Sequence, residues 1–243
     1  MGENLNFLLA NNRNINVPVC LYFNDTKDYL SSFLDENAVN EHEKIRVSDT
    51  LIESWQKTTG IFDCFAEYNL LHIEASIYLM KYDCCLFHSV AVWINGKAWL
   101  LAGSSGIGKS TQYKNMLQIA PALIQIINGD KPLLEITDDI IFVHPSPWNG
   151  KEGWHSDISA PLEGIVFLKQ ETQNIIQRLD KPHSIIPVFR SICQDYRNDA
   201  VLEDTARLSE KIIMSIPIWE FSNDGSLNSS EILLQHIMAK GGI

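Results

Sequence analysis

The most informative stretch of this chain is Gly103-Ser104-Ser105-Gly106-Ile107-Gly108-Lys109-Ser110. It fits the pattern G-x-x-x-x-G-K-[ST] of the P-loop, which binds nucleoside triphosphates. The glycines let backbone N–H groups approach the phosphates, Lys109 can reach the β- and γ-phosphates, and the Ser110 hydroxyl can bind Mg²⁺. We therefore expect ATP and Mg²⁺ as cofactors, with ATP bound by Gly103, Ser104, Ser105, Gly106, Ile107, Gly108, Lys109, Ser110 and Thr111.

The residues around this loop predict a strand before it and a helix after it. Val90 to Ile94 and Lys97 to Ala102 are rich in β-formers, and Asn95-Gly96 between them is a strong hairpin signal. Ser110 to Ile119 carries apolar residues at helical spacing, so the positive end of a helix dipole would face the phosphates. A chance Gly/Ser turn fits the pattern alone, but the flanking strand and helix favour a P-loop.

A P-loop site also needs an acidic residue for the metal or for the attacking group, and Asp130 is the best candidate. It comes just after the buried-type strand Leu123 to Ile127, within Asn128-Gly129-Asp130. The alternative is a simple turn residue, because Asn-Gly-Asp is good turn chemistry. Asp138 and Asp139, between two further apolar runs, are interpreted as a hairpin turn only.

Residues 144–155 form a second concentration of functional side chains. Phosphoryl transfer needs positive charge on the transferring group in addition to the metal, and Lys151 can supply it. Four other residues of this loop can bind a substrate or form an aromatic wall: Glu152, His155, Trp148 and Trp154. The alternative is a surface loop with solvated charges and buried tryptophans.

Hairpins combined with strand–helix units predict an α/β fold, a P-loop domain with a mixed sheet. Its later elements are a strand at Ile165 to Leu168, helices within 182–197 and 200–214, a strand at Ile218 to Phe221 and a helix at Ser230 to Met238. Residues 1–85 differ in character, with Asn-rich stretches and two helices, Asp49 to Gln56 and Glu67 to Met80. We expect a small N-terminal accessory region in 1–85 and the P-loop domain in 86–243.

Composition excludes several classes of partner. Lys and Arg number 19 and Asp and Glu number 30 among the 243 residues, so the net charge is -11 and nucleic acid is not the expected partner. No apolar run approaches the about 18 residues that span a membrane, and Met1 to Ala10 has neither the basic n-region nor the long apolar core of a signal peptide. The 5 cysteines form no CxxC pair. These features predict a cytoplasmic protein with reduced thiols that does not act at a membrane.

The chain resembles the catalytic domain of HPr kinase/phosphorylase, a family related to ATP-dependent phosphoenolpyruvate carboxykinase. The resemblance rests on His88-Ser89-Val90, the Asn95-Gly96 hairpin, the loop Gly103 to Ser110, and Asp130 beyond the next strand. It is specific over residues 86–136 and looser toward the C-terminus. The chain also resembles HPr-kinase-like proteins of ribosomal peptide biosynthesis, which phosphorylate a serine of a precursor peptide.

The resemblance implies a role for each site residue. Lys109 would clamp the phosphates, Ser110 would hold Mg²⁺, Asp130 would be the general base, and His88 would support the phosphates. For His88, a structural histidine at a strand start is the alternative. The family usually has two adjacent acids where this chain has Asp130-Lys131, which argues against a pair of metal-binding carboxylates. Because the family forms hexamers, the resemblance also leaves a homo-oligomer open.

The sequence therefore predicts an ATP-dependent kinase that acts on a hydroxyl, namely a serine of a peptide or small protein. One alternative keeps the chemistry and changes the acceptor to a small metabolite. The other alternative is a nucleotide-binding sensor or assembly module without catalytic activity. An ABC-type ATPase is disfavoured because no LSGGQ-like signature occurs.

Overall fold

The predicted hairpin lies in the middle of the larger of two sheets. In the computed structural model, which describes residues 3–10, 13–35, 44–196 and 198–240, β5 (Ser89–Ile94) and β6 (Lys97–Ala102) pair antiparallel. Asn95 and Gly96 have φ values of 51° and 82°, the left-handed conformation that such a turn requires. The hairpin prediction is confirmed, and β6 leads directly into the Gly103–Ser110 loop.

The larger sheet has nine strands and mixed pairing. Its parallel part is β6-β10-β12, and β5 and β7 extend it antiparallel on one side while β11 closes the other side. The start of β10 also pairs with β9, which continues to β8 and β4. The strands besides the hairpin are β4 (Cys84–Leu86), β7 (Ile124–Asn128), β8 (Leu133–Ile136), β9 (Ile141–His144), β10 (Ala160–Gln170), β11 (Ile175–Arg178) and β12 (Ile218–Asn223).

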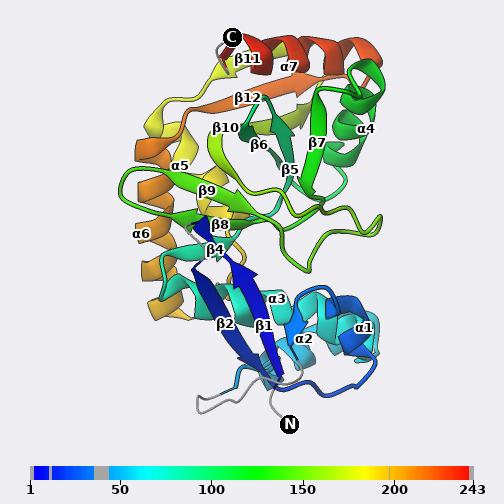
Figure 1. Cartoon of the computed structure of the whole chain (residues 1–243), viewed down its shortest axis with the longest axis vertical. Coiled ribbons are helices and arrows are strands. Elements are labelled where there is room, and N and C mark those ends of the chain that lie inside the picture. Colours follow the sequence, from blue (N-terminus) through cyan, green and yellow to red (C-terminus); the bar gives the residue numbers. More distant parts are fainter. Residues whose placement is uncertain (1–2, 11–12, 36–43, 197, 241–243) are drawn as a thin grey trace.

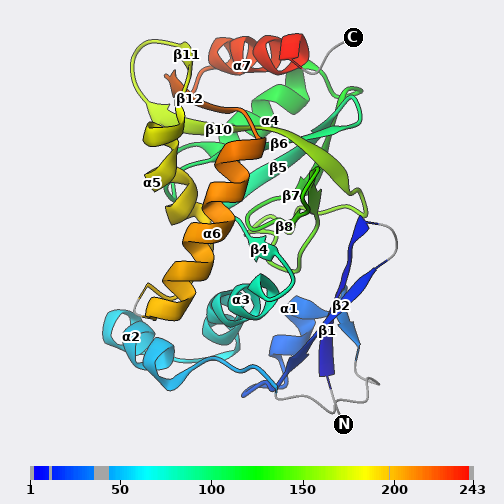
Figure 2. The ribbon, with the colours of Figure 1, turned by 90° about the vertical axis from the view of Figure 1, so that its left-hand side faces the viewer.

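Alternating apolar residues let helices cover both faces of this sheet. Val90, Val92 and Leu101 face the core shared with α4 and α7, whereas Ala91 and Leu100 face the core shared with α5 and α6. Figures 1 and 2 show the two helix pairs on opposite faces. The helices are α4 (Lys109–Ile119), α5 (Lys181–Ser191), α6 (Asp199–Ser215) and α7 (Leu227–Lys240). The structure thus confirms the mixed α/β fold.

A buried glutamine fixes α4 against its neighbours and thereby sets the direction of the helix. Gln112 Nε2 donates to Asn223 Oδ1 (2.9 Å) and Ser229 Oγ (3.1 Å), and its Oε1 accepts from Ser230 Oγ (2.7 Å). Gln112 is 1% exposed, so these bonds satisfy a group that would otherwise be costly to bury. The N-terminus of α4 is therefore held at the carboxyl end of the parallel strands.

The N-terminal region contains a small second sheet that the sequence analysis did not predict. Its order is β2-β1-β3, and Figure 1 shows it below the larger sheet, next to α3. Leu5 and Phe7 are buried in β1 and alternate with asparagines. This alternation with a period of two is typical of a strand, but the Asn-rich composition of the segment obscured it. The elements are β1 (Glu3–Leu8), β2 (Asn14–Val19), α1 (Thr26–Leu30), β3 (Leu34–Asp35), α2 (Asp49–Thr59) and α3 (Cys64–Met80).

The two regions meet through a buried carboxylate. Glu135 on β8 is 4% exposed and accepts hydrogen bonds from Ala10 N (2.9 Å), Arg13 Nη2 (3.1 Å) and His144 Nε2 (3.1 Å). Strand β4, which pairs with β8, lies across the boundary expected after residue 85. The division into two domains stays a prediction, and the N-terminal region packs firmly on the larger sheet.

Two predictions about environment also concern the fold. Within the described part of the chain, no helix combines the length and apolar character needed to cross a bilayer. All 5 cysteines, counted in the full sequence, are free thiols. Burial raises the pKa of the Cys84 and Cys193 thiols to about 12. Such thiols stay protonated and are poor nucleophiles.

Candidate functional site

The loop from Gly103 to Ser110 has the geometry of an anion site. Gly106 and Gly108 have φ values of 79° and 105°, and a Cβ on either would point into open space. No side chain caps the N-terminus of α4, so its first backbone N–H groups are available to a ligand. A chain of phosphates fits this cradle because free N–H groups and the helix dipole both favour negative charge.

Lys109 folds back over the loop that precedes it. Its Nζ donates to Gly103 O (2.9 Å) and Ser104 O (3.2 Å) and lies 3.2 Å from His88 Nε2. Burial lowers the pKa of Lys109, the charge of Asp130 opposes this shift, and the charge of Lys131 adds to it. These bonds hold the ammonium group over the Gly103–Ser110 loop, where it would meet a bound phosphate.

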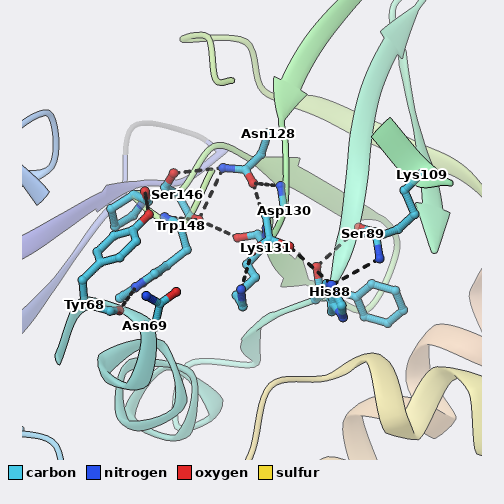
Figure 3. A network of polar contacts seen from close by, with 12 residues as sticks. Tyr68, Asn69, His88, Ser89, Lys109, Asn128, Asp130, Lys131, Ser146 and Trp148 are labelled. Atoms are coloured by element: carbon cyan, nitrogen blue, oxygen red, sulfur yellow. Dashed lines mark hydrogen bonds and ion pairs between the residues drawn. The ribbon is translucent and has the colours of Figure 1, made fainter. Parts of the chain in front are cut away.

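Asp130 lies between two basic side chains, as Figure 3 shows. Its Oδ1 is 3.3 Å from His88 Nε2, and its Oδ2 forms an ion pair with Lys131 Nζ. Burial alone would raise the pKa of Asp130, but the His88 hydrogen bond and the Lys131 charge outweigh it and hold this pKa well below the ordinary value. Asp130 is therefore an ionised carboxylate across the neutral pH range.

His88 connects Lys109 with Asp130 through one nitrogen atom. That nitrogen, Nε2, can accept a hydrogen bond from Lys109 or donate one to Asp130, but it cannot do both at once. The three residues come from β6–α4, from the start of β5 and from the turn after β7. The structure thus brings together the predicted residues Lys109, His88 and Asp130 around one cavity, and the functional role of His88 stays a prediction.

A buried asparagine shapes the turn that carries Asp130. Asn128 Oδ1 accepts from the backbone N–H of Asp130 (3.0 Å) and of Lys131 (2.9 Å), while its Nδ2 donates to Ser146 O (2.9 Å). The backbone also approaches closely here, because a Cβ on Gly129 would collide with the carbonyl oxygen of Asn149. Asn128 is fully buried, so it is a positioning residue for Asp130.

His88, Lys109 and Asp130 line one cavity of about 620 Å³, which is the size of a single ligand pocket. Its lining residues are Phe65, Tyr68, Asn69, His88, Ser105, Gly106, Gly108, Lys109, Ser110, Thr111, Gly129, Asp130, Lys131, Trp148, Gly150, Lys151 and Glu152. Three residues predicted to bind ATP do not line it: Gly103, Ser104 and Ile107. The first two bind Lys109 through their carbonyl oxygens, and Ile107 packs against Gly103.

The donor set fits a magnesium ion bound together with a nucleotide. Ser110 offers a hydroxyl oxygen and Asp130 a carboxylate, and both line the cavity. Among the described residues, no three His, Cys, Asp or Glu side chains gather into a metal cluster. Mg²⁺ in nucleotide sites commonly uses one or two protein oxygens together with the phosphates and waters.

Some residues of the loop at 144–155 line the cavity, and others pack away from it. Lys151 is exposed, lines the cavity, and has no hydrogen-bond or ion-pair partner among the described residues. Glu152 also lines it and pairs with Lys114 on α4 at 3.3 Å. Trp154 and His155 do not line it: the Trp154 ring packs on Tyr113 of α4, and His155 contacts Asn149 at 3.0 Å. Of the two tryptophans expected to form an aromatic wall, only Trp148 lines the cavity, and its side chain is 2% exposed.

Sequence reasoning missed five residues of the site. Three come from one face of α3, and the other two are Asn128 and Lys131 beside Asp130. The α3 residues are Phe65, Tyr68 and Asn69. Their spacing of three and four is a helical face, but nothing local indicates what that face meets. Lys131 could have been found from its position next to Asp130.

No protein-family model matches this chain, and no curated protein matches it either. Among solved structures, the chain is similar to the Hpr(Ser) kinase/phosphatase from Coxiella burnetii, with a TM-score of 0.37 and 11% sequence identity. That likeness covers 65% of this chain and 99% of the other chain. The relationship is distant, and the roles of the site residues stay predictions that rest on the geometry above.

Proposed function

We propose that this protein is an ATP-dependent kinase of the HPr-kinase type that phosphorylates a serine hydroxyl of a peptide or small protein. The observation that carries the proposal is a single cavity in which the uncapped N-terminus of α4, Lys109 and Asp130 converge. Phosphoryl transfer is achieved mostly by positioning and charge stabilisation, and these groups supply both.

The phosphate side of the site is formed by the loop and by α4. Backbone N–H groups and Lys109 would bind the β- and γ-phosphates, and Ser110 and Asp130 would hold Mg²⁺, which would supply positive charge to the transferring group. On binding, Lys109 must exchange its bonds to Gly103 O and Ser104 O for bonds to phosphate oxygens.

The acceptor side is formed around Asp130. The acceptor oxygen bonds to the γ-phosphorus, the bond from that phosphorus to the β–γ bridging oxygen breaks, and ADP leaves. The hydroxyl proton passes to Asp130 and then to solvent. A carboxylate with a lowered pKa is a weak base. In a loose transition state the proton is lost late, so Asp130 acts chiefly by orienting the hydroxyl.

Two further lysines and one histidine complete the site. Lys131 and Lys151 line the cavity and would stabilise charge on the transferring phosphoryl group. Lys131 stands where the family that this chain resembles usually has a second acid, so the proposal uses a single metal ion. His88 would donate to Asp130 once Lys109 turns to the phosphates, since Nε2 is then free of the ammonium group.

Nucleotide binding and turnover test this proposal together. With Mg²⁺ present, ATP should raise the melting temperature, and ADP should accumulate when serine peptides are added. Asp130→Asn should keep the ATP-dependent shift and lose ADP formation by at least about a hundredfold. A melting temperature that ATP leaves unchanged would contradict the proposal. ADP formation that survives Asp130→Asn would instead favour a nucleotide-binding module whose chemistry does not use Asp130.

A further inference from the structure

One face of α3 forms the cavity wall that lies away from the phosphate cradle. Phe65, Tyr68 and Asn69 are spaced three and four residues apart, so they lie on the same side of the helix. Figure 3 shows Tyr68 and Asn69 on one side of Asp130 and Lys131, with His88 and Lys109 on the other side. The cavity therefore has a phosphate wall, an α3 wall, and Asp130 between them.

The α3 wall presents an aromatic surface to the open side of the cavity. Phe65 is 49% exposed although it is fully apolar. Its ring centroid lies 6.1 Å from that of Tyr29, and Tyr29 stacks on Tyr68 at 5.1 Å. A half-exposed aromatic cluster that borders a polar cavity is the composition of a ligand-binding surface.

This wall is fixed in place by the loop that follows β9. Tyr68 Oη donates to Pro147 O (2.9 Å), and Trp148 Nε1 donates to Tyr68 O (2.8 Å). The Trp148 ring also contacts His72 on α3 edge to face, with centroids 6.2 Å apart. Because Lys131 N donates to Trp148 O at 2.9 Å, the same loop holds both the wall and the turn of Asp130. The loop that follows β9 therefore fixes the distance between the α3 wall and Asp130.

The geometry of the reaction decides which substrate meets this wall. The leaving oxygen belongs to the nucleotide on the phosphate wall, and the attacking oxygen approaches roughly in line from the opposite side. Asp130, which would orient the attacking hydroxyl, lies between the two walls. A substrate that attacks across Asp130 therefore enters along α3.

We infer that the face of α3 formed by Phe65, Tyr68 and Asn69 is the acceptor subsite and binds an apolar, preferably aromatic, side chain close in sequence to the phosphorylated serine. This inference rests on the proposed kinase function. The Asn69 amide donates to Phe65 O at 2.7 Å, which leaves its carbonyl oxygen for a backbone N–H of the bound peptide. The N-terminal region thus selects the substrate, and the P-loop domain transfers the phosphoryl group.

A serine peptide library tests the inference. Peptides with one serine and a fixed residue at each flanking position are incubated with radiolabelled [γ-³²P]ATP and Mg²⁺, with Phe, Leu, Ala or Glu as the fixed residue. The wild type should prefer Phe over Ala at one offset by about tenfold or more. Phe65→Ala should bring this ratio close to one and leave the MgATP-dependent melting shift in place. Phe65→Tyr should keep the preference.

Tyr82→Ala is the matched control, because Tyr82 lies just beyond the other end of α3, is 42% exposed and does not line the cavity. It should keep the wild-type ratio. A Phe65→Ala protein with an unchanged ratio, or a wild type without side-chain preference, would overturn the inference. So would a loss of the MgATP shift in Phe65→Ala, which would assign the wall to the nucleotide. A wild type that does not bind MgATP would instead refute the proposed function.

Discussion

The sequence predicts the phosphate wall of the cavity but not the α3 wall. The phosphate wall is one contiguous stretch, Gly103 to Ser110, in which each residue has a local role that a pattern can encode. The α3 wall consists of Phe65, Tyr68 and Asn69, which acquire a role only because Pro147 and Trp148 hold the helix beside Asp130. The residues of the proposed phosphate side are thus local in sequence, whereas the proposed acceptor side depends on tertiary contacts.

This difference predicts different effects of mutation on the two walls. Changes in the phosphate wall should remove turnover and leave the fold intact. Changes at the contacts behind the α3 wall should affect stability and turnover together, because those contacts also carry the structure. The following variants are ordered from the largest expected effect to the smallest.

Lys109→Met should lower the rate of phosphoryl transfer by about a thousandfold, because it removes the ammonium group that meets the β- and γ-phosphates. Single-turnover formation of labelled phosphopeptide measures this. Lys114→Met is the matched control on the same helix, since Lys114 is exposed and pairs only weakly with Glu152. Equal rates for the two variants would remove Lys109 from the phosphate wall.

Asn128→Ala should reduce both stability and turnover. It leaves the N–H group of Asp130 without its acceptor, at a cost of about 1–3 kcal/mol, whereas the N–H group of Lys131 keeps its bond to Trp148 O. Displacement of Asp130 should lower the rate of phosphoryl transfer by about tenfold to a hundredfold. Urea unfolding and the transfer assay measure the two effects. Asn115→Ala, at a half-buried site where the amide makes only long hydrogen bonds to Gly225 O (3.4 Å) and Ser226 O (3.5 Å), should change stability by less than about 0.5 kcal/mol. Wild-type stability of Asn128→Ala would show that the turn holds without this amide.

His72 should make the α3 wall sensitive to acid. Burial and the charges of Lys131 and His88 lower the pKa of His72 to about 3, against the opposing charge of Asp130. The unfolded chain then takes up a proton below about pH 6.5 that the native chain does not take up, so native stability falls as the pH falls from 6.5 toward 3.

Replacement of His72 by Phe should remove this contribution. From pH 6 to pH 4, the unfolding free energy of His72→Phe should decrease less steeply than that of the wild type, by up to about 1.4 kcal/mol per pH unit. Chemical denaturation at several pH values measures the slopes. Parallel slopes for His72→Phe and wild type would mean that His72 is protonated in the native protein.

Tyr68→Phe should have the smallest effect. Burial raises the pKa of Tyr68 to about 12, so its hydroxyl is neutral, and the variant loses one hydrogen bond to Pro147 O. We expect a loss of about 1 kcal/mol in unfolding free energy and a reduction of transfer by a small factor. Tyr29→Phe is the control, since the Tyr29 hydroxyl bonds to none of the described residues. A loss as large as that of Asn128→Ala would mean that the Pro147 contact fixes the whole loop.

The same contrast explains how much of the molecule could be predicted. The hairpin before the loop, the helix after it and the position of Asp130 follow from turn chemistry and periodicity over short windows. The N-terminal sheet was missed because Leu5 and Phe7 alternate with asparagines that resemble loop residues. Trp148 and Trp154 read alike in the sequence, and only the packing on Tyr68 or on Tyr113 separates their roles.

The central claim is that the cavity transfers the γ-phosphoryl group of ATP to a serine hydroxyl. The most direct measurement follows the label of [γ-³²P]ATP in the presence of the protein, Mg²⁺ and a pool of serine peptides. We predict that label appears as phosphoserine and that Lys109→Met and Asp130→Asn each abolish its appearance. Label that stays in ATP, or that appears only as inorganic phosphate, would contradict the claim.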